Sequence, residues 1–181
     1  MVFVFIAEGF EEIEAITPVD VLRRAGLCVE TVSVEKELKV TGAHGITIVC
    51  DTTLAESEKV QADALVLPGG MPGALGLLHS TLLLERIRRE NEKGTLLCAI
   101  CAAPMVFAKA GILDGRKAVI YPGMEAEIKG AIPSSAMVCV DGNLITSLGP
   151  ATALPFSLEV LKTLTDAHTR EEIERGMLFH D

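Results

Sequence analysis

The 181-residue sequence lacks any excess of positive charge, and it also lacks a long apolar run. Sixteen lysines and arginines stand against 25 aspartates and glutamates, which gives a formal net charge of −9. Nucleic-acid-binding surfaces are usually basic, so this balance argues against a nucleic-acid partner. No apolar stretch reaches the roughly 20 residues that span a bilayer, and no basic segment precedes the first apolar run. We therefore expect no membrane anchor, no signal peptide and a cytoplasmic location.

The sequence also lacks the patterns that bind metals, nucleotides or disulfide frameworks. An odd number of cysteines at irregular spacing, in a chain of this length, does not suit a disulfide scaffold. Cys98 and Cys101 form a CxxC pair, but no second cysteine or histidine pair accompanies them as a zinc site requires. The glycine-rich stretch 67–76, LPGGMPGALG, has no Lys and no Ser or Thr, so it is not a P-loop. No metal and no cofactor are expected.

Apolar runs alternate with amphipathic segments along the chain. The runs at 2–7, 64–67 and 96–100 are continuous, as strands buried on both faces are. The segments 11–26 and 80–94 have helical spacing and end at glycines. This alternation predicts an α/β fold with a mostly parallel sheet covered on both faces, and the length suits a single domain, 1–181. A late hairpin is expected to turn at Asp141 and Gly142.

Three segments should meet at one edge of that sheet, because ligands bind beyond the carboxyl ends of parallel strands. They are 7–14, in which three glutamates cluster at residues 11, 12 and 14, 68–73, which contains two adjacent glycines, and 100–104, which contains a cysteine. We expect the functional site at this edge.

Cys101 follows the buried run directly and precedes small residues that suit the start of a helix. A side chain on such a strand-to-helix turn is held exposed, as in a nucleophile elbow. A helix N-terminus behind it favours the thiolate, so we expect a lowered pKa for Cys101, with N–H groups at Gly69 and Gly70 facing an oxyanion. The alternative is one more buried cysteine. A disulfide to Cys98 is disfavoured, since three strand residues cover about 10 Å and bridged Cα atoms lie within about 7 Å.

Four stretches together resemble the ThiJ/PfpI family, most closely its parkinsonism-associated deglycase group, which includes the bacterial YajL proteins. They are AEGFEEIEAITPVDVLRRAG, ALVLPGG, AICAAP and ITSLGPATA, in this order and over nearly the whole chain. The resemblance implies a flavodoxin-like three-layer sandwich and a homodimer. It makes Cys101 the reactive cysteine and Glu14 the carboxyl that hydrogen-bonds it.

Glu14 and the charged residues near the site are expected to have different roles. A confined carboxyl beside a thiolate is driven towards its neutral form, and a protonated Glu14 can donate a hydrogen bond to the sulfur. Glu11 and Glu12 are expected to be solvated glutamates of the first helical turn. We expect Arg24 to reach the partner's pocket in a dimer, and His44 lies in a loop that approaches the pocket in the family.

One position departs from the family pattern. Deglycase-like members carry a histidine where this chain has Tyr121, its only tyrosine. Protease-like members carry a histidine directly after the cysteine, where this chain has Ala102. A phenol titrates near pH ~10, so Tyr121 is a poor base at neutral pH but can donate a hydrogen bond to a substrate oxygen.

Three functions stay open at this point. The first is a cysteine-dependent glyoxalase or deglycase acting on small aldehydes or their thiol and amine adducts, including glycated substrates, with weak activity because tyrosine replaces histidine. Gly70 and Ala102 would then hold the substrate oxygen. The second is a redox-sensing, chaperone-like protein of oxidative stress whose Cys101 is oxidised to sulfinate. An amidase or protease is the third, and the missing histidine disfavours it.

Overall fold

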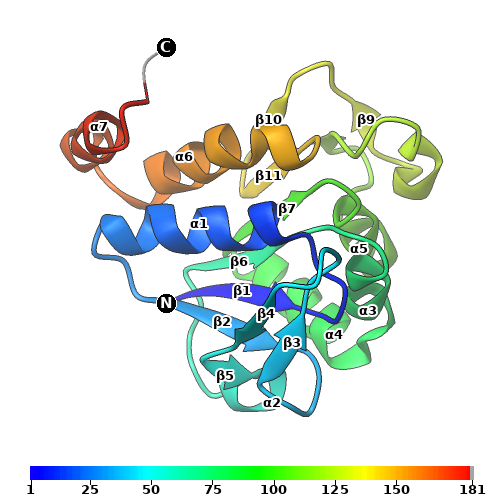
Figure 1. Ribbon diagram of the computed structural model, residues 1–181. Coiled ribbons are helices and arrows are strands. Elements are labelled where there is room, and N and C mark those ends of the chain that lie inside the picture. Colours follow the sequence, from blue (N-terminus) through cyan, green and yellow to red (C-terminus); the bar gives the residue numbers. More distant parts are fainter. Residues whose placement is uncertain (180–181) are drawn as a thin grey trace.

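The computed structural model describes residues 1–179 and is built around a seven-stranded sheet (Figure 1). Its strand order is β10-β11-β7-β6-β1-β2-β5, and every neighbouring pair is parallel except β10 with β11. The strands of this sheet are β1 (Val2–Ile6), β2 (Val29–Ser33), β5 (Thr52–Thr53), β6 (Ala64–Leu67), β7 (Leu96–Ile100), β10 (Val138–Asp141) and β11 (Leu144–Ser147). The predicted α/β class with a mostly parallel sheet is confirmed.

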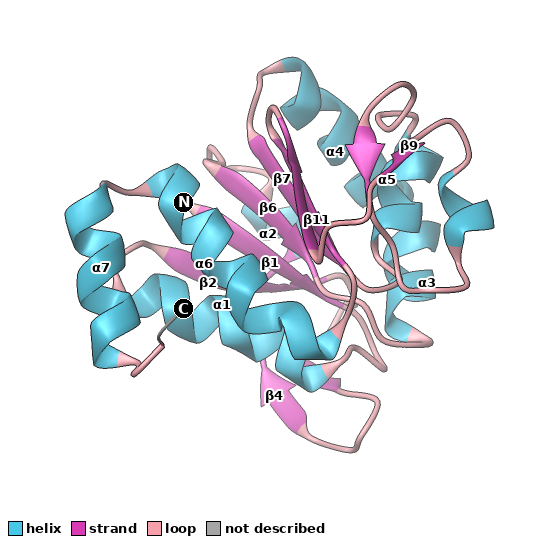
Figure 2. Cartoon of the chain, turned by 90° about the horizontal axis from the view of Figure 1, so that it is seen from above, coloured by secondary structure: helices cyan, strands magenta, loops and turns pink. Residues whose placement is uncertain are grey.

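Two short strand pairs lie outside this sheet. The pair β3 (Lys39–Thr41) and β4 (Thr47–Val49) is antiparallel, and the pair β8 (Lys117–Ala118) and β9 (Ile132–Pro133) is parallel. The β3–β4 hairpin projects away from the sheet beside the start of α1 (Figure 2).

Helices cover both faces of the sheet and complete three layers, as Figure 2 shows from above. On one face lie α1 (Glu12–Arg24) and α6 (Ala153–Leu164), with α7 (Ala167–Gly176) packed outside α6. The other face carries α3 (Gly73–His79), α4 (Thr81–Glu92) and α5 (Pro104–Ala110), and α2 (Leu54–Ser57) packs beside β2 and β5. Two short 3-10 helices are η1 (Glu125–Ile128) and η2 (Pro150–Thr152). No helix in residues 1–179 is long and apolar enough to cross a membrane.

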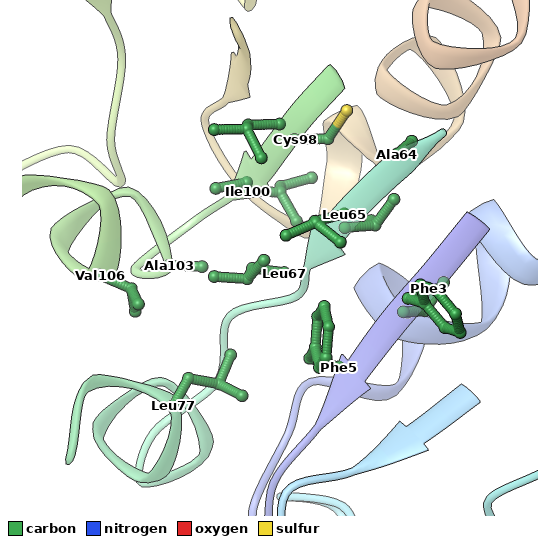
Figure 3. Close-up of a cluster of buried hydrophobic side chains, with 14 of the residues drawn as sticks. Phe3, Phe5, Ala64, Leu65, Leu67, Leu77, Cys98, Ile100, Ala103 and Val106 are labelled. Carbon is green, nitrogen blue, oxygen red and sulfur yellow. The ribbon is translucent and has the colours of Figure 1, made fainter. Parts of the chain in front are cut away.

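The continuous apolar runs form the central strands because both of their faces are covered. Every residue of β1, β6 and β7 is buried. Figure 3 shows how Phe5, Leu67 and Leu77 gather between the sheet and α3, with Ala103 and Val106 beside them. This packing fixes the carboxyl ends of β1, β6 and β7, from which the site is built.

The late hairpin differs from its prediction by one residue. Asp141 pairs with Leu144, so the two turn residues are Gly142 and Asn143 rather than Asp141 and Gly142. Gly142 takes a positive φ of 59°, which a glycine adopts at no steric cost. Asp141 instead stays in the ladder, where its carboxylate accepts a hydrogen bond from the Lys117 N–H at 2.6 Å.

Candidate active site

Cys101 occupies a sharp turn at the end of β7, as the sequence predicts. Its backbone has a φ of +62°, a conformation that residues other than glycine rarely adopt. The N–H of Cys101 donates to the carbonyl of Ser147 at the end of β11, at 2.9 Å. Its own carbonyl accepts from the N–H of Tyr121, also at 2.9 Å. These two bonds hold the strained residue from both sides, so the thiol has a fixed position at the sheet edge.

The thiol is nearly buried and faces two backbone donors. Only 9% of Cys101 is exposed. The N–H groups of Gly70 and Ala102 hydrogen-bond to its sulfur and favour the thiolate. The helix α5 begins three residues after Cys101, at Pro104, so residues 101–103 form a turn that presents the Ala102 N–H, while the Gly70 N–H comes from the segment after β6. Of the two glycine N–H groups expected to face an oxyanion, that of Gly70 lies at the sulfur, whereas that of Gly69 donates to Glu14 instead.

Glu14 lies on the first turn of α1 and is completely buried. Its Oε2 accepts a hydrogen bond from the Gly69 N–H at 2.8 Å. Its Oε1 is buried and finds no well-aligned N–H or O–H donor among the described residues, while the Cys101 thiol interacts with this carboxyl. Burial, together with the charge of Glu11, raises the pKa of Glu14 to about 7. A carboxyl in this position holds a proton near neutral pH.

The expected lowering of the Cys101 pKa is wrong: with Glu14 charged, the pKa of the thiol is raised. Burial first, and then the negative charge of Glu14, raise the pKa of Cys101 to about 12, against the opposing effect of the Gly70 and Ala102 N–H groups. Groups coupled this strongly titrate as a pair. One proton leaves the pair near pH 7, and the charged Glu14 then resists loss of the second. A thiolate at neutral pH therefore requires that Glu14 keep its proton.

Residues 69 and 70 must be glycine because neighbouring atoms lie where a Cβ atom would stand. A Cβ atom on Gly69 would lie 2.7 Å from the Cβ of Cys101 and 2.8 Å from Oε2 of Glu14. On Gly70, where φ is +87°, a Cβ would lie 2.4 Å from the backbone nitrogen of Glu11. The glycine pair thus allows the segment after β6 to bring the Gly69 N–H to the Glu14 carboxyl and the Gly70 N–H to the Cys101 thiol.

Glu11 and Glu12 are buried, and the expectation of two solvated glutamates is wrong. Glu11 caps α1 by accepting from the Glu14 N–H at 2.8 Å, and its charge raises the pKa of Glu14. Glu12 accepts from the backbone N–H of His44 and pairs with the His44 ring, both at 2.7 Å. Gly42 leaves the room that Glu12 occupies. The spacing of Glu11 and Glu14, three residues apart at a helix start, was the sequence signal for the cap.

His44 contacts Glu12, and no contact joins it to Cys101. Its imidazole is exposed, and the hydrogen bond and charge of Glu12 raise its pKa. The side-chain atoms of Glu11, Glu12 and His44 that could ligate a metal ion lie within 4.8 Å of one another. Because Glu12 and His44 already bind each other, we interpret this group as the ion pair that fastens the 42–46 turn to α1.

Three further residues that the sequence singles out have different surroundings. Tyr121 is 46% exposed, and its ring lies against Gly149, where a Cβ would be 3.4 Å from the ring. Arg24 pairs with Asp20 at 2.8 Å, ten residues and about 15 Å of helix away from Glu14. Cys98 lies fully buried within β7, and burial raises its pKa beyond the range of ordinary thiols. It is free, as are the other four cysteines.

The fold and this site define a class: a flavodoxin-like α/β protein with a cysteine on a nucleophile elbow beside a buried carboxyl. The model of the DJ-1/PfpI family matches residues 1–163. The chain is 37% identical to the Drosophila melanogaster protein dj-1beta, over 97% of this chain and 95% of that one. It is 32% identical to the Danio rerio Parkinson disease protein 7 homolog, over 98% of this chain and 96% of that one.

The chain therefore belongs to the DJ-1/PfpI family. Among solved structures, oxidized Toxoplasma gondii DJ-1 superposes with a TM-score of 0.95 at 34% identity. The match covers 99% of this chain and 98% of that chain. The predicted resemblance to this family is confirmed.

Replacement of Glu14 by Gln should make the protein more stable at pH 8 than wild type. The folded-state pKa of Glu14 is about 7, above the 4.5 of the free group, so the folded chain holds this proton more tightly than the unfolded chain. The resulting stabilisation is complete below pH 4.5 and is lost as the pH rises through 7. The loss amounts to about 3 kcal/mol.

Urea unfolding at pH 4.5 and pH 8 measures this difference. The free-energy gap between Glu14→Gln and wild type should widen by about 3 kcal/mol towards pH 8. The exposed Glu127→Gln variant is the control, and its gap should not change. An equal gap for Glu14→Gln at both pH values contradicts the assignment.

Proposed function

We propose that the protein is a cysteine-dependent enzyme of the glyoxalase or deglycase type, acting on small aldehydes or on their thiol and amine adducts. The observation that carries this proposal is the pairing of a nucleophile-elbow thiol with a buried carboxyl whose pKa is about 7. An aldehyde carbon is a natural target for such a thiol. A group that titrates near the working pH is suited to moving protons.

The first step forms a bond between the Cys101 sulfur and the aldehyde carbon. The thiol proton ends on the former carbonyl oxygen, so the product is a neutral hemithioacetal. The N–H groups of Gly70 and Ala102, which face the sulfur, hold the oxygen while it carries negative charge. Glu14 takes the thiol proton as the sulfur attacks and passes it to that oxygen, so its carboxylate is charged again and can act as the base in the next step.

With methylglyoxal, the hemithioacetal carbon then loses its proton to Glu14 and the neighbouring carbonyl carbon gains one. This isomerisation leaves a thioester on Cys101, and water releases it as lactate, so the net reaction adds one water. No oxidant and no cofactor are required. The free cysteines suit a reducing compartment such as the cytoplasm, where we expect the protein to work.

Turnover of methylglyoxal tests the assignment of the thiol and the carboxyl. Cys101→Ser should abolish it. Glu14→Gln should lower it at least about 100-fold, since general acid–base catalysis typically contributes 10²–10⁴-fold. Cys28→Ser removes an exposed thiol and should leave the rate unchanged. Lactate release is followed by NMR, and full activity in Cys101→Ser would refute the proposal.

A second function has its own supporting observation, because one of the most similar solved structures is of an oxidized DJ-1. Two molecules of peroxide would convert the Cys101 thiol to a sulfinic acid and release two waters, and a protonated Glu14 would donate to a sulfinate oxygen. A mass gain of two oxygens on Cys101 under mild peroxide, without turnover of methylglyoxal, favours this redox-sensing role.

Substitution of Tyr121 should change turnover without changing the reactivity of the Cys101 thiol. Its backbone N–H supports Cys101, and a histidine at this position supplies the same N–H, but only the imidazole titrates near neutral pH. Tyr121→His should therefore raise methylglyoxal turnover about 10- to 100-fold. The rate at which iodoacetamide alkylates Cys101 should stay within about twofold. Tyr121→Phe is the control, and no gain in the histidine variant would show that another group already moves the proton.

A homodimer is the assembly that we propose. Four apolar side chains project to solvent from α1 and the β3–β4 hairpin: Ile13, Ile16, Ile46 and Val49, with Val49 71% exposed. Glu12 hydrogen-bonds the backbone of the 44–46 turn, which joins the helix start and the hairpin into one surface. Clustered exposed apolar groups mark interaction sites. Across such an interface Arg24 is expected to approach the partner's pocket.

Ile46→Asp should turn the dimer into a monomer, because a carboxylate at a buried contact carries a large desolvation penalty. Light scattering at micromolar concentration reports the mass. Leu82→Asp changes an exposed apolar residue on α4, on the opposite face of the sheet, and should leave the dimer intact. A monomeric wild-type protein would rule out the assembly.

A further inference from the structure

A partly enclosed hollow beside the site is not used by the chemistry proposed above. The cavity has a volume of about 180 Å³ and lies between the segment that follows β8 and the 3-10 helix η1. Its floor is made of the buried residues Ala118, Val119, Ile120 and Ile128. An apolar cavity of about 150 Å³ is large enough to bind benzene, so this one has room for a six-membered ring with a small substituent.

The mouth of the cavity offers donors. Lys129 lines it and is exposed, and its ammonium has no hydrogen-bond or ion-pair partner among residues 1–179. Ser134 also lines it; its oxygen accepts from the Ala136 N–H at 3.2 Å, which leaves the hydroxyl hydrogen free to donate. Glu125 is the one acidic residue of the lining, and its carboxylate already accepts from the Gly123 N–H at 3.0 Å.

We propose that this cavity binds a small carboxylate with an apolar body, such as an aromatic acid. The ring would occupy the floor and the carboxylate would lie at the mouth, within reach of the Lys129 ammonium and the Ser134 hydroxyl. A free ammonium beside an apolar hollow favours an anion over a neutral molecule of the same shape, although Glu125 weakens this preference.

Two segments that line the cavity continue directly into residues beside the reactive site. Ile120 and Pro122 line it on either side of Tyr121, whose N–H donates to the Cys101 carbonyl. Leu148 lines it and precedes Gly149, against which the Tyr121 ring lies. A bound molecule is therefore expected to perturb the signals of Tyr121 as well as those of the cavity. The proposal does not depend on the reaction that Cys101 performs.

Titration of the isotope-labelled protein with benzoate, followed by NMR, tests the proposal. Saturable shifts should appear at the backbone N–H signals of Val119, Ile120 and Ile128. Benzamide, which has the same shape without the charge, should bind about threefold to fivefold more weakly, the range that an exposed ion pair supports. Absence of saturable shifts, or equal affinity for the two probes, overturns the proposal.

Two variants locate the binding. Ala131→Leu places a larger side chain in the cavity and should weaken benzoate binding at least tenfold. Lys129→Gln should weaken benzoate to the level of benzamide and leave benzamide unchanged, whereas Lys36→Gln, on an exposed loop, should change neither. If Ala131→Leu does not fold, the Lys129→Gln comparison decides alone. Unchanged benzoate affinity in a folded Ala131→Leu, or in Lys129→Gln, overturns the assignment.

Discussion

The left-handed backbone of Cys101 is the constraint on which the site depends. A residue with a side chain takes this conformation only where its surroundings hold it there. Here the Ser147 carbonyl and the Tyr121 N–H hold it, one from the neighbouring strand and one from the segment beyond α5. The turn then places the sulfur against the end of β6, and that approach is open only because residue 69 has no Cβ. The parallel sheet matters to the chemistry because it fixes three strand ends at once.

Within that frame, the Glu14 carboxyl and the Cys101 thiol each oppose the ionisation of the other. The carboxyl of Glu14 has a raised pKa because it is buried, and the thiol has a raised pKa because it is buried beside the carboxyl. A charged Glu14 suppresses the thiolate, whereas a protonated Glu14 removes that charge and can donate to the sulfur. Glu11 favours the protonated form through its own negative charge. The cap of α1 thus has an electrostatic effect as well as a structural one.

Local sequence patterns predicted the fold. For the site, the sequence predicted which residues matter better than it predicted their burial and pKa values. Continuous apolar runs identify β1, β6 and β7 because burial on both faces leaves no polar alternation. The places of Cys101 and the glycine pair after those strands singled them out, whereas Glu14 was chosen among its neighbouring glutamates only through the family resemblance. The burial of Glu12 did not follow, because a turn more than 30 residues away covers it and supplies its donors. The direction of the Cys101 pKa failed for the same reason: desolvation arises from the whole assembled edge.

The contact at Tyr121 shows which part of this residue supports the elbow. Position 121 contributes to the elbow through its backbone N–H, which every residue except proline supplies. The side chain has a separate place, 46% exposed and with its ring against Gly149. Gly149 leaves space for a ring at this place, so the larger phenol is accommodated without displacing the backbone. A substitution of residue 121 by any residue except proline therefore retains the backbone N–H that bonds the Cys101 carbonyl.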